Sequence, residues 1–244
     1  MRYLVLSDIH SNLEAFETVL KDAGDVEQVW CLGDVVGYGP DPNGCVELLR
    51  SLPHLCIAGN HDWATLGKLD LEDFNPDARI ANLWNREQLT PDNLTYLETR
   101  PEKLAVGSFS MAHGSPRYPI WEYITYPSIA QVNFDYFDTP FCLVGHTHVP
   151  VIFHLRDLDE QVFCQTINPP VGQGLKLKPG RYIINPGSVG QPRDGDPRAS
   201  YILLDLDTLT IEYRRIAYPF EKTQAKMVEH NLPFRLILRL GYGW

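Results

Sequence analysis

The decisive stretch is Arg2-Tyr3-Leu4-Val5-Leu6-Ser7-Asp8-Ile9-His10, a short apolar run that ends in an aspartate and a histidine two positions apart. Such a run is typical of a buried strand, and the apolar spacing that begins at Leu13 predicts a helix after it. Residues 28–32 and 55–58 repeat the strand pattern, with helical spacing over residues 43–52 between them. This alternation predicts βαβ units and a largely parallel sheet.

Polar residues also close the next four strand-like runs. They are Gly33-Asp34, Gly59-Asn60-His61-Asp62, Ala112-His113-Gly114 and Gly145-His146-Thr147-His148. In open α/β sheets, binding sites form outside the carboxyl ends of the strands, so these side chains are expected on one rim with Asp8 and His10. Glycine beside four of the five groups leaves room where the backbone turns tightly and approaches a ligand.

This donor set points to metal ions. Carboxylate and imidazole ligands without thiolate suit Mn, Fe, Co, Ni or Zn. Two such ions about 3.5–4 Å apart can clamp the attacking and leaving oxygens of a phosphoryl displacement. Each motif alone is also an ordinary turn sequence. All five in this order, each after an apolar run, favour a dinuclear site over unrelated turn residues.

The motifs together resemble the five-motif signature of the calcineurin-like metallophosphoesterase superfamily. The stretch Asn185-Pro186-Gly187-Ser188 is similar to a motif of the small bacterial and archaeal phosphodiesterase branch of that superfamily. The resemblance covers about residues 1–215. It implies an α/β fold, a four-layer αββα sandwich of two mixed β-sheets flanked by helices.

The resemblance also implies a role for each residue of the site. The first of two divalent metal ions would be held by Asp8, His10, Asp34 and His148. The second would be held by Asp34, Asn60, His113 and His146, with Asp34 bridging. His61 would be the catalytic residue that is not a ligand, contacting the substrate phosphate and assisting the leaving group. Manganese is the first expectation for the metal, with Fe, Ni, Co or Zn as alternatives.

Three residues are candidates for substrate binding. Asn12 could hydrogen-bond the phosphate, or it could cap the helix that begins at Leu13. Arg117 could bind a second phosphate bidentately, and the aromatic segment 118–126 beside it could stack a nucleobase, pack in the core or form a dimer contact. Arg193 could complete an anion pocket in the loop 191–198, unless internal salt bridges hold that loop.

The chain is interpreted as one domain over residues 1–244. A polar segment with several prolines, about residues 63–104, is expected to be a helical excursion. After Pro150 the pattern is all-β, with strands at 151–155 and 161–165 around a turn at 157–160, and further strands at 181–184, 201–206 and 209–214. A helical C-terminal tail is expected at about 219–244, packing on the sandwich or forming a homo-oligomer contact.

These features predict a dinuclear metal-dependent phosphoesterase. It would hydrolyse phosphodiester or phosphoanhydride bonds, including those of nucleotides, by in-line attack of metal-bound hydroxide. A phosphomonoesterase is the alternative. A protein phosphatase is disfavoured because residues 35–42, after Asp34, contain no arginine. A non-catalytic scaffold of the same fold is disfavoured because the whole set of site residues is present.

The composition of the chain limits the classes of molecule that it is expected to bind. The chain has 31 acidic and 21 basic residues and a net charge of −10, which argues against an extended nucleic-acid-binding surface and favours a small phosphate ester or nucleotide. Two divalent ions and a hydroxide would bring the total to about −7 and make the pocket locally positive. No apolar run suits a membrane span or a signal peptide. The five cysteines, odd in number and without a CxxC motif, are expected to be reduced thiols of a cytoplasmic protein.

Overall fold

The computed structural model describes residues 1–158 and 161–244. Its strands form two six-stranded sheets. The first sheet has the order β3-β2-β1-β11-β12-β9 and consists of β1 (Arg2–Leu6), β2 (Gln28–Cys31), β3 (His54–Cys56), β9 (Gly174–Lys176), β11 (Ala199–Asp205) and β12 (Thr210–Ile216). The second has the order β4-β5-β6-β10-β7-β8 and consists of β4 (Lys103–Val106), β5 (Phe109–Ala112), β6 (Phe141–Leu143), β7 (Val151–Leu158), β8 (Gln161–Ile167) and β10 (Arg181–Asn185).

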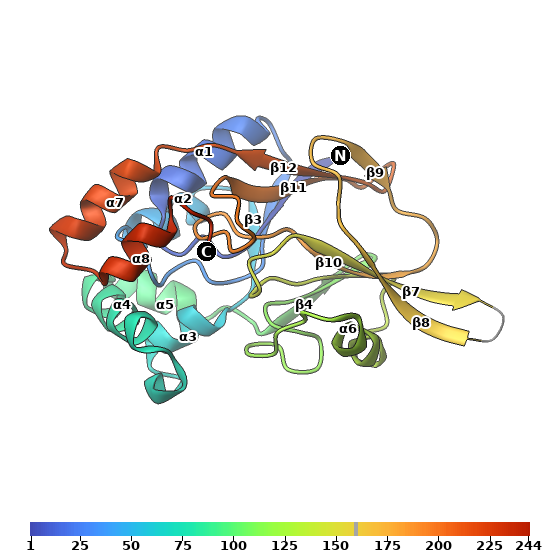
Figure 1. Ribbon diagram of the computed structural model, residues 1–244, viewed down its shortest axis with the longest axis horizontal. Helices are drawn as coiled ribbons and strands as arrows, with labels where there is room; N and C mark the ends of the chain where they lie inside the picture. The colour runs from blue at the N-terminus through green and yellow to red at the C-terminus, as the bar shows by residue number, and fades with distance from the viewer. Residues whose placement is uncertain (159–160) are drawn as a thin grey trace.

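Helices flank both sheets (Figure 1). They are α1 (Leu13–Ala23), α2 (Pro42–Arg50), α3 (Asn60–Leu66), α4 (Pro76–Gln88), α5 (Pro91–Glu98), α6 (Pro127–Asn133), α7 (Phe220–Glu229), α8 (Phe234–Arg239) and the short 3-10 helices η1 (Leu71–Asp73) and η2 (Phe134–Tyr136). Proline begins α2, α4, α5 and α6, a position where its missing N–H breaks no helical hydrogen bond. None of the helices in the described ranges is long and apolar enough to cross a bilayer.

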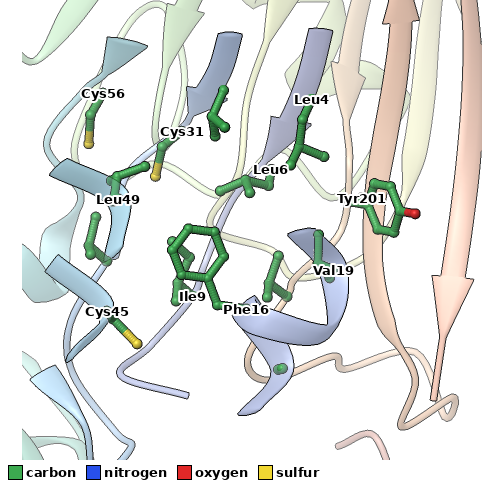
Figure 2. Packing of buried hydrophobic residues seen from close by; sticks show 14 of the residues in the cluster. Leu4, Leu6, Ile9, Phe16, Val19, Cys31, Cys45, Leu49, Cys56 and Tyr201 are labelled. Atoms are coloured by element: carbon green, nitrogen blue, oxygen red, sulfur yellow. The ribbon is translucent and has the colours of Figure 1, made fainter. Parts of the chain in front are cut away.

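The side chains of β1 explain the layering, because successive residues of a strand point to opposite faces of the sheet. Leu4 and Leu6 pack in a cluster with Phe16 of α1 (Figure 2), whereas Val5 belongs to the cluster between the two sheets, with Ile184 of β10. On the outer face of the second sheet, α6 and η2 cover a third cluster. The resulting order of helices, sheet, sheet and helices confirms the predicted four-layer αββα sandwich.

The expectation of a largely parallel sheet is wrong beyond the first three strands. β1 and β3 both pair with β2 in parallel, but β1 also pairs antiparallel with β11, and β11 with β12. The second sheet is mixed as well, because β6 is parallel to β5 and β10 while β7 is antiparallel to β10 and β8. An apolar run indicates that a strand is buried, but it does not indicate which distant strand pairs with it, as β11 does with β1.

β7 and β8 form an antiparallel hairpin that projects from one end of the molecule (Figure 1). Both strands are longer than the expected segments 151–155 and 161–165. Asp157, expected in the turn, instead pairs with Val162 in the ladder. Residues 159–160 of the expected turn lie outside the described residues.

The C-terminal helices α7 and α8 pack beside α4 at the end of the molecule opposite the hairpin (Figure 1). Met227, Leu236 and Leu240 of this tail share a cluster with Ala78 of α4 and with Tyr38, in the loop after β2. The tail therefore packs on the body of the fold, one of the two arrangements expected for it.

Candidate metal centre

The carboxyl ends of strands from both sheets meet at one edge of the sandwich. Strands β1, β2 and β3 of the first sheet and β5 and β6 of the second are followed by the seven predicted ligands: Asp8, His10, Asp34, Asn60, His113, His146 and His148. The motifs alone suggested one rim of an open sheet. In the structure, the site lies instead between the edges of two sheets, so ligand side chains reach it from both sheets.

Asp8, His10, Asp34 and His148 form the first cluster, in which each offers one ligand atom within 4.8 Å of the others. His148 Nε2 lies 3.3 Å from Asp8 Oδ1, and His10 Nε2 lies 3.6 Å from Asp34 Oδ2. The Nε2 atoms of His10 and His148 are 3.1 Å apart. All four residues are buried, so their polar atoms converge in a small volume with little exposure to solvent.

Asp34, His113 and His146 form the second cluster within the same limit. His113 Nε2 lies 3.3 Å from Asp34 Oδ2 and 3.0 Å from Asn60 Oδ1. Asp34 Oδ2 is therefore close to a histidine of each cluster. This position, between the two clusters, is the one that a bridging carboxylate needs.

Two carboxylate oxygens in the centre, Asp8 Oδ1 and Asp34 Oδ2, have no hydrogen-bond partner among the described residues. A buried acceptor left in this way costs about 1–3 kcal/mol. Both orphaned oxygens lie beside histidine nitrogens, and the donor set contains carboxylate, amide and imidazole groups without thiolate. These donors suit divalent transition metals, so the residues present fit two such ions.

Protonation in the centre follows from burial and charge. Burial opposes ionisation of Asp8, but the positive charge of His148 beside it outweighs burial and lowers the pKa of Asp8 to about 2. Burial also opposes protonation of His113, yet the Asp34 carboxylate raises the pKa of His113 to about 9. A proton on His113 thus balances carboxylate charge that a cation could balance instead. Burial lowers the pKa of His10 and His146 well below the usual range, which leaves their nitrogens free to ligate.

Main-chain oxygens orient the histidine rings, as is usual for metal ligands. The Nδ1 atoms of His10, His113 and His148 donate to the carbonyls of Val36, Leu32 and Gln191, at 3.2, 2.8 and 2.5 Å. His146 is reversed, because its Nε2 lies 3.2 Å from the Trp121 carbonyl. In every case one ring nitrogen is held by the backbone and the other is left for the centre.

Asp62 holds two of the loops together, a role that the motif reading missed. Its Oδ2 accepts from the main-chain N–H groups of Gly59 (3.0 Å) and Asp34 (2.9 Å), and its Oδ1 accepts from that of Val36 (3.1 Å). Burial and the charge of Asp34 raise the pKa of Asp62 to about 7. The signal was in the sequence, since Asp62 is the third residue of α3 and can bond back to the Gly59 N–H as in a capping box.

The backbone at the centre is unusual. Five of the predicted ligands, none of them glycine, have φ between 51° and 66°: Asp8, His10, Asp34, His146 and His148. Such left-handed conformations cost about 1–3 kcal/mol each and gather at functional sites. Among the motif glycines, Gly33 adopts a positive φ of 92°, whereas Gly59 and Gly145 serve close packing. A Cβ on Gly59 would collide with the Asp34 carboxylate, and one on Gly145 with the Ser7 hydroxyl.

His61 is buried beside the centre. Its ring centroid lies 4.9 Å from that of His10 and 4.2 Å from that of Tyr38. Its Nδ1 lies 2.9 Å from Oδ1 of Asn82, on α4, and burial lowers the pKa of His61 to about 4. Tyr38 and Asn82 are contacts of the site that the motifs did not indicate, because both lie outside them.

The side chain of Asn12 forms hydrogen bonds to other groups of the protein. Its Oδ1 accepts from the Ala15 N–H (3.2 Å) and caps α1, while its Nδ2 donates to the Gly190 carbonyl (2.9 Å) and to Tyr218 Oη (3.0 Å). The capping alternative therefore describes Asn12. Arg117 forms an ion pair with Glu122, so its guanidinium is already engaged by a carboxylate.

The other two candidate regions lie closer to the centre. Arg193 Nη2 is 3.3 Å from Tyr38 Oη, whereas Arg198 of the same loop pairs with Asp196, as the salt-bridge alternative expects. The expectation that the aromatic segment could pack in the core is wrong, because Tyr118, Trp121, Tyr123 and Tyr126 are 38–66% exposed. The Tyr123 ring stacks on His146 with 3.8 Å between centroids, and Tyr123 also lines a cavity of about 390 Å³.

Comparison with known proteins gives consistent results. Residues 1–209 match the family model of the calcineurin-like phosphoesterase superfamily domain. An uncharacterized protein from Methanocaldococcus jannaschii is 40% identical over 246 residues, which cover 98% of this chain and 97% of that protein. The crystal structure of a metallophosphoesterase from Sphaerobacter thermophilus is 49% identical, with a TM-score of 0.88 over 100% of this chain and 99% of the other. A hypothetical protein from Pyrococcus horikoshii shares the fold at 20% identity, with a TM-score of 0.77 over 100% and 98% of the two chains.

Proposed function

Because the chain belongs to the calcineurin-like phosphoesterase superfamily and is a phosphoric ester hydrolase, we propose that it is a dinuclear enzyme that hydrolyses phosphodiester or phosphoanhydride bonds, including those of nucleotides. One observation carries the proposal. Asp34 Oδ2, a buried carboxylate oxygen without a hydrogen-bond partner in the described chain, lies between a histidine of each of two clusters of metal-ligand type. A single divalent site would not need this shared oxygen.

The predicted ligands would form two sets, one for each metal ion. The first ion would be held by Asp8, His10, Asp34 and His148, and the second by Asp34, Asn60, His113 and His146. When bound, these ions supply positive charge that polarises the phosphoryl group and lowers the pKa of water. Manganese is our first choice, with Fe, Ni, Co or Zn as the alternatives.

His61 would act on the leaving group. Its Nδ1 is engaged by Asn82, which leaves Nε2 to give a proton to the departing oxygen. Burial lowers the pKa of His61 to about 4 in the free protein, and the negative charge of a bound phosphate would oppose that effect. Asn82 then acts as a positioning residue, because it fixes the ring that delivers the proton.

The aromatic side of the centre suits a nucleotide or another substrate with a planar group. Tyr123 stacks on His146, and with Tyr126, Thr147 and Asn168 it lines the 390 Å³ cavity. A base there would stack on an exposed ring, and the Asn168 amide offers both a donor and an acceptor. We also place the protein in the cytoplasm, since all five cysteines are buried free thiols, as a reducing compartment favours.

Hydrolysis of bis(p-nitrophenyl) phosphate with Mn²⁺, Ni²⁺, Zn²⁺ and Mg²⁺ tests the proposal, beside p-nitrophenyl phosphate, a phosphopeptide and a dinucleoside polyphosphate. We expect the diester or the anhydride to be the best substrate. A preference for p-nitrophenyl phosphate would favour a phosphomonoesterase, and one for the phosphopeptide a protein phosphatase. No hydrolysis of any of them by folded protein with any of the metals would favour a non-catalytic scaffold.

The His61→Ala variant separates the catalytic role from ligation. Turnover should fall about 10²- to 10⁴-fold, the usual contribution of a general acid, while two metal ions per chain are retained. His230→Ala is the matched control, because it removes an exposed histidine from the tail. Loss of metal together with activity in His61→Ala would instead make His61 a ligand or a structural residue.

A further inference from the structure

Two arginines from distant parts of the chain meet at one amide oxygen next to the centre. Arg193 Nη2 donates to Gln191 Oε1 at 2.9 Å, and Arg239 Nη1 donates to the same atom at 3.1 Å. Arg193 lies in the loop after β10. Arg239 is the last residue of α8, in the C-terminal tail, well beyond the last metal-binding motif.

Neither guanidinium is neutralised by an acidic side chain. In residues 1–158 and 161–244, no aspartate or glutamate forms an ion pair with Arg193 or Arg239, although Asp194 and Asp196 pair with other arginines close by. Arg193 Nε is buried and has no partner within the described ranges. Arg239 Nε is engaged, because it donates to the main-chain oxygen of Trp244, the last residue of the sequence (2.5 Å), so the donors of Arg239 that could meet a ligand are those of its Nη atoms. Two like charges held side by side, with a donor to spare, are what an anion-binding site provides.

Gln191 and Tyr38 connect this arginine pair to the metal centre. The Gln191 carbonyl accepts from Nδ1 of His148, a predicted ligand, while the Gln191 side chain accepts from both arginines. The Arg193 guanidinium lies over the Tyr38 ring, 5.6 Å from its centroid, and the same ring packs against His61. Arg193 and Arg239 are therefore each one residue away from a side chain of the centre.

We propose that Arg193 and Arg239 form a second subsite, which binds the phosphoryl group next to the one being hydrolysed. The inference rests on the proposed function and narrows its substrate class to compounds with at least two linked phosphates, that is, to phosphoanhydrides. Guanidinium groups suit this task because their planar forks bind phosphate oxygens bidentately and keep their charge. Arg239 becomes a specificity-determining residue, and the tail becomes part of the site.

A pair of nucleotides that differ by one phosphate tests the subsite by binding alone. The probes are AMP and the non-hydrolysable α,β-methylene-ADP, titrated calorimetrically into the full-length protein with Mn²⁺ in excess. We expect wild type to bind the diphosphate at least tenfold more tightly than AMP. In Arg239→Gln this preference should fall below threefold. In Arg235→Gln it should persist, because that substitution removes an exposed arginine from the same helix, one turn earlier.

Two further variants guard against a folding defect. Arg239→Lys keeps the positive charge but not the planar guanidinium, so its preference for the diphosphate should be intermediate. Arg193→Gln should lower that preference as Arg239→Gln does. Melting temperatures report whether each variant is folded. Equal affinity of wild type for the two nucleotides, no binding of either, or an equal loss in Arg235→Gln would overturn the proposal. Because neither probe needs to be hydrolysed, the answer does not depend on the proposed reaction, whose own failure would show in the aryl phosphodiester assay.

Discussion

Replacing Asn85 by alanine should destabilise the protein more than the same replacement at Asn82, although both are buried asparagines of α4. Asn85 Oδ1 accepts from the Ser11 hydroxyl (2.6 Å) and from the main-chain N–H of Gly37 (3.0 Å), and its Nδ2 donates to the Gly39 carbonyl (3.1 Å). These bonds tie α4 to the loops that follow β1 and β2. Both loops carry predicted metal ligands.

The size of the effect follows from the groups left behind. Alanine at position 85 leaves the N–H of Gly37 and the carbonyl of Gly39 without these partners in a buried region. Each unsatisfied buried group costs about 1–3 kcal/mol, so the free energy of unfolding should fall by about 2–6 kcal/mol. Asn82 makes one side-chain hydrogen bond, to His61, and its Nδ2 has no partner in the described part of the chain. Its replacement leaves the buried His61 Nδ1 unpaired but also removes the unpaired Nδ2, so the net cost should be about 1 kcal/mol.

Urea-induced unfolding followed by far-UV circular dichroism measures both free energies, with a chelator present so that metal binding does not contribute. The two substitutions remove the same atoms from the same helix, so the comparison isolates the hydrogen bonds from the cavity. Destabilisation of the two variants by the same amount, within about 0.5 kcal/mol, would refute the assignment of Asn85 as the tie between α4 and the loops.

Four further outcomes are expected. Asn82→Ala should lower turnover of the aryl phosphodiester about tenfold, less than the 10²- to 10⁴-fold that loss of the general acid itself costs, with the metal content unchanged by mass spectrometry; a loss of metal would contradict this. Chelation should lower the melting temperature by about 5–10 °C for each site, since a site at 100 Kd of metal contributes about 2.7 kcal/mol; an unchanged midpoint would contradict metal binding by the folded state. Gly59→Ala should lose metal, because its Cβ meets the Asp34 carboxylate, while Gly174→Ala, where Thr210 is 3.2 Å away, should retain it. Thiol reagents should label fewer than one cysteine in the native protein and all five after unfolding, since the five are buried.

The predicted ligands could be found from the sequence because each follows an apolar run that is visible as a strand. His10 and His148 are 138 positions apart, yet their Nε2 atoms lie 3.1 Å from each other. Only the ends of the strands had to be located for this, since parallel strands bring their carboxyl ends to the same edge. The order of strands in the sheets did not have to be known. That order was not predicted, because β11 pairs with β1, and β12 with β11, from the far end of the chain.

The residues that support the ligands could not be found in this way. Asn82 and Asn85 lie in the segment 63–104, whose polar composition resembles a solvated helix face, yet both are buried in the structure. Their partners are a histidine ring and main-chain groups of other loops, and no local pattern records a bond across such a distance in sequence. The same holds for Arg239, which meets Arg193 only because the tail folds back onto the body.

Glycine marked only some of the left-handed backbone positions at the centre. Gly33 makes a tight turn as expected, with φ of 92°, but Gly59 has φ of −108°, and ligands such as Asp8 and His146 themselves adopt left-handed conformations. Left-handed backbone costs a non-glycine residue about 1–3 kcal/mol, so the five left-handed ligands together cost about 5–15 kcal/mol, which is comparable with the total stability of many domains. Glycine would relieve that strain but has no side chain to bind a cation, and aspartate and histidine are among the residues that tolerate the conformation best. The strain is therefore the consequence of placing the donor atom on the turn itself. The packing of the sandwich compensates for the energy of this strain, and bound cations would compensate for a further part of it.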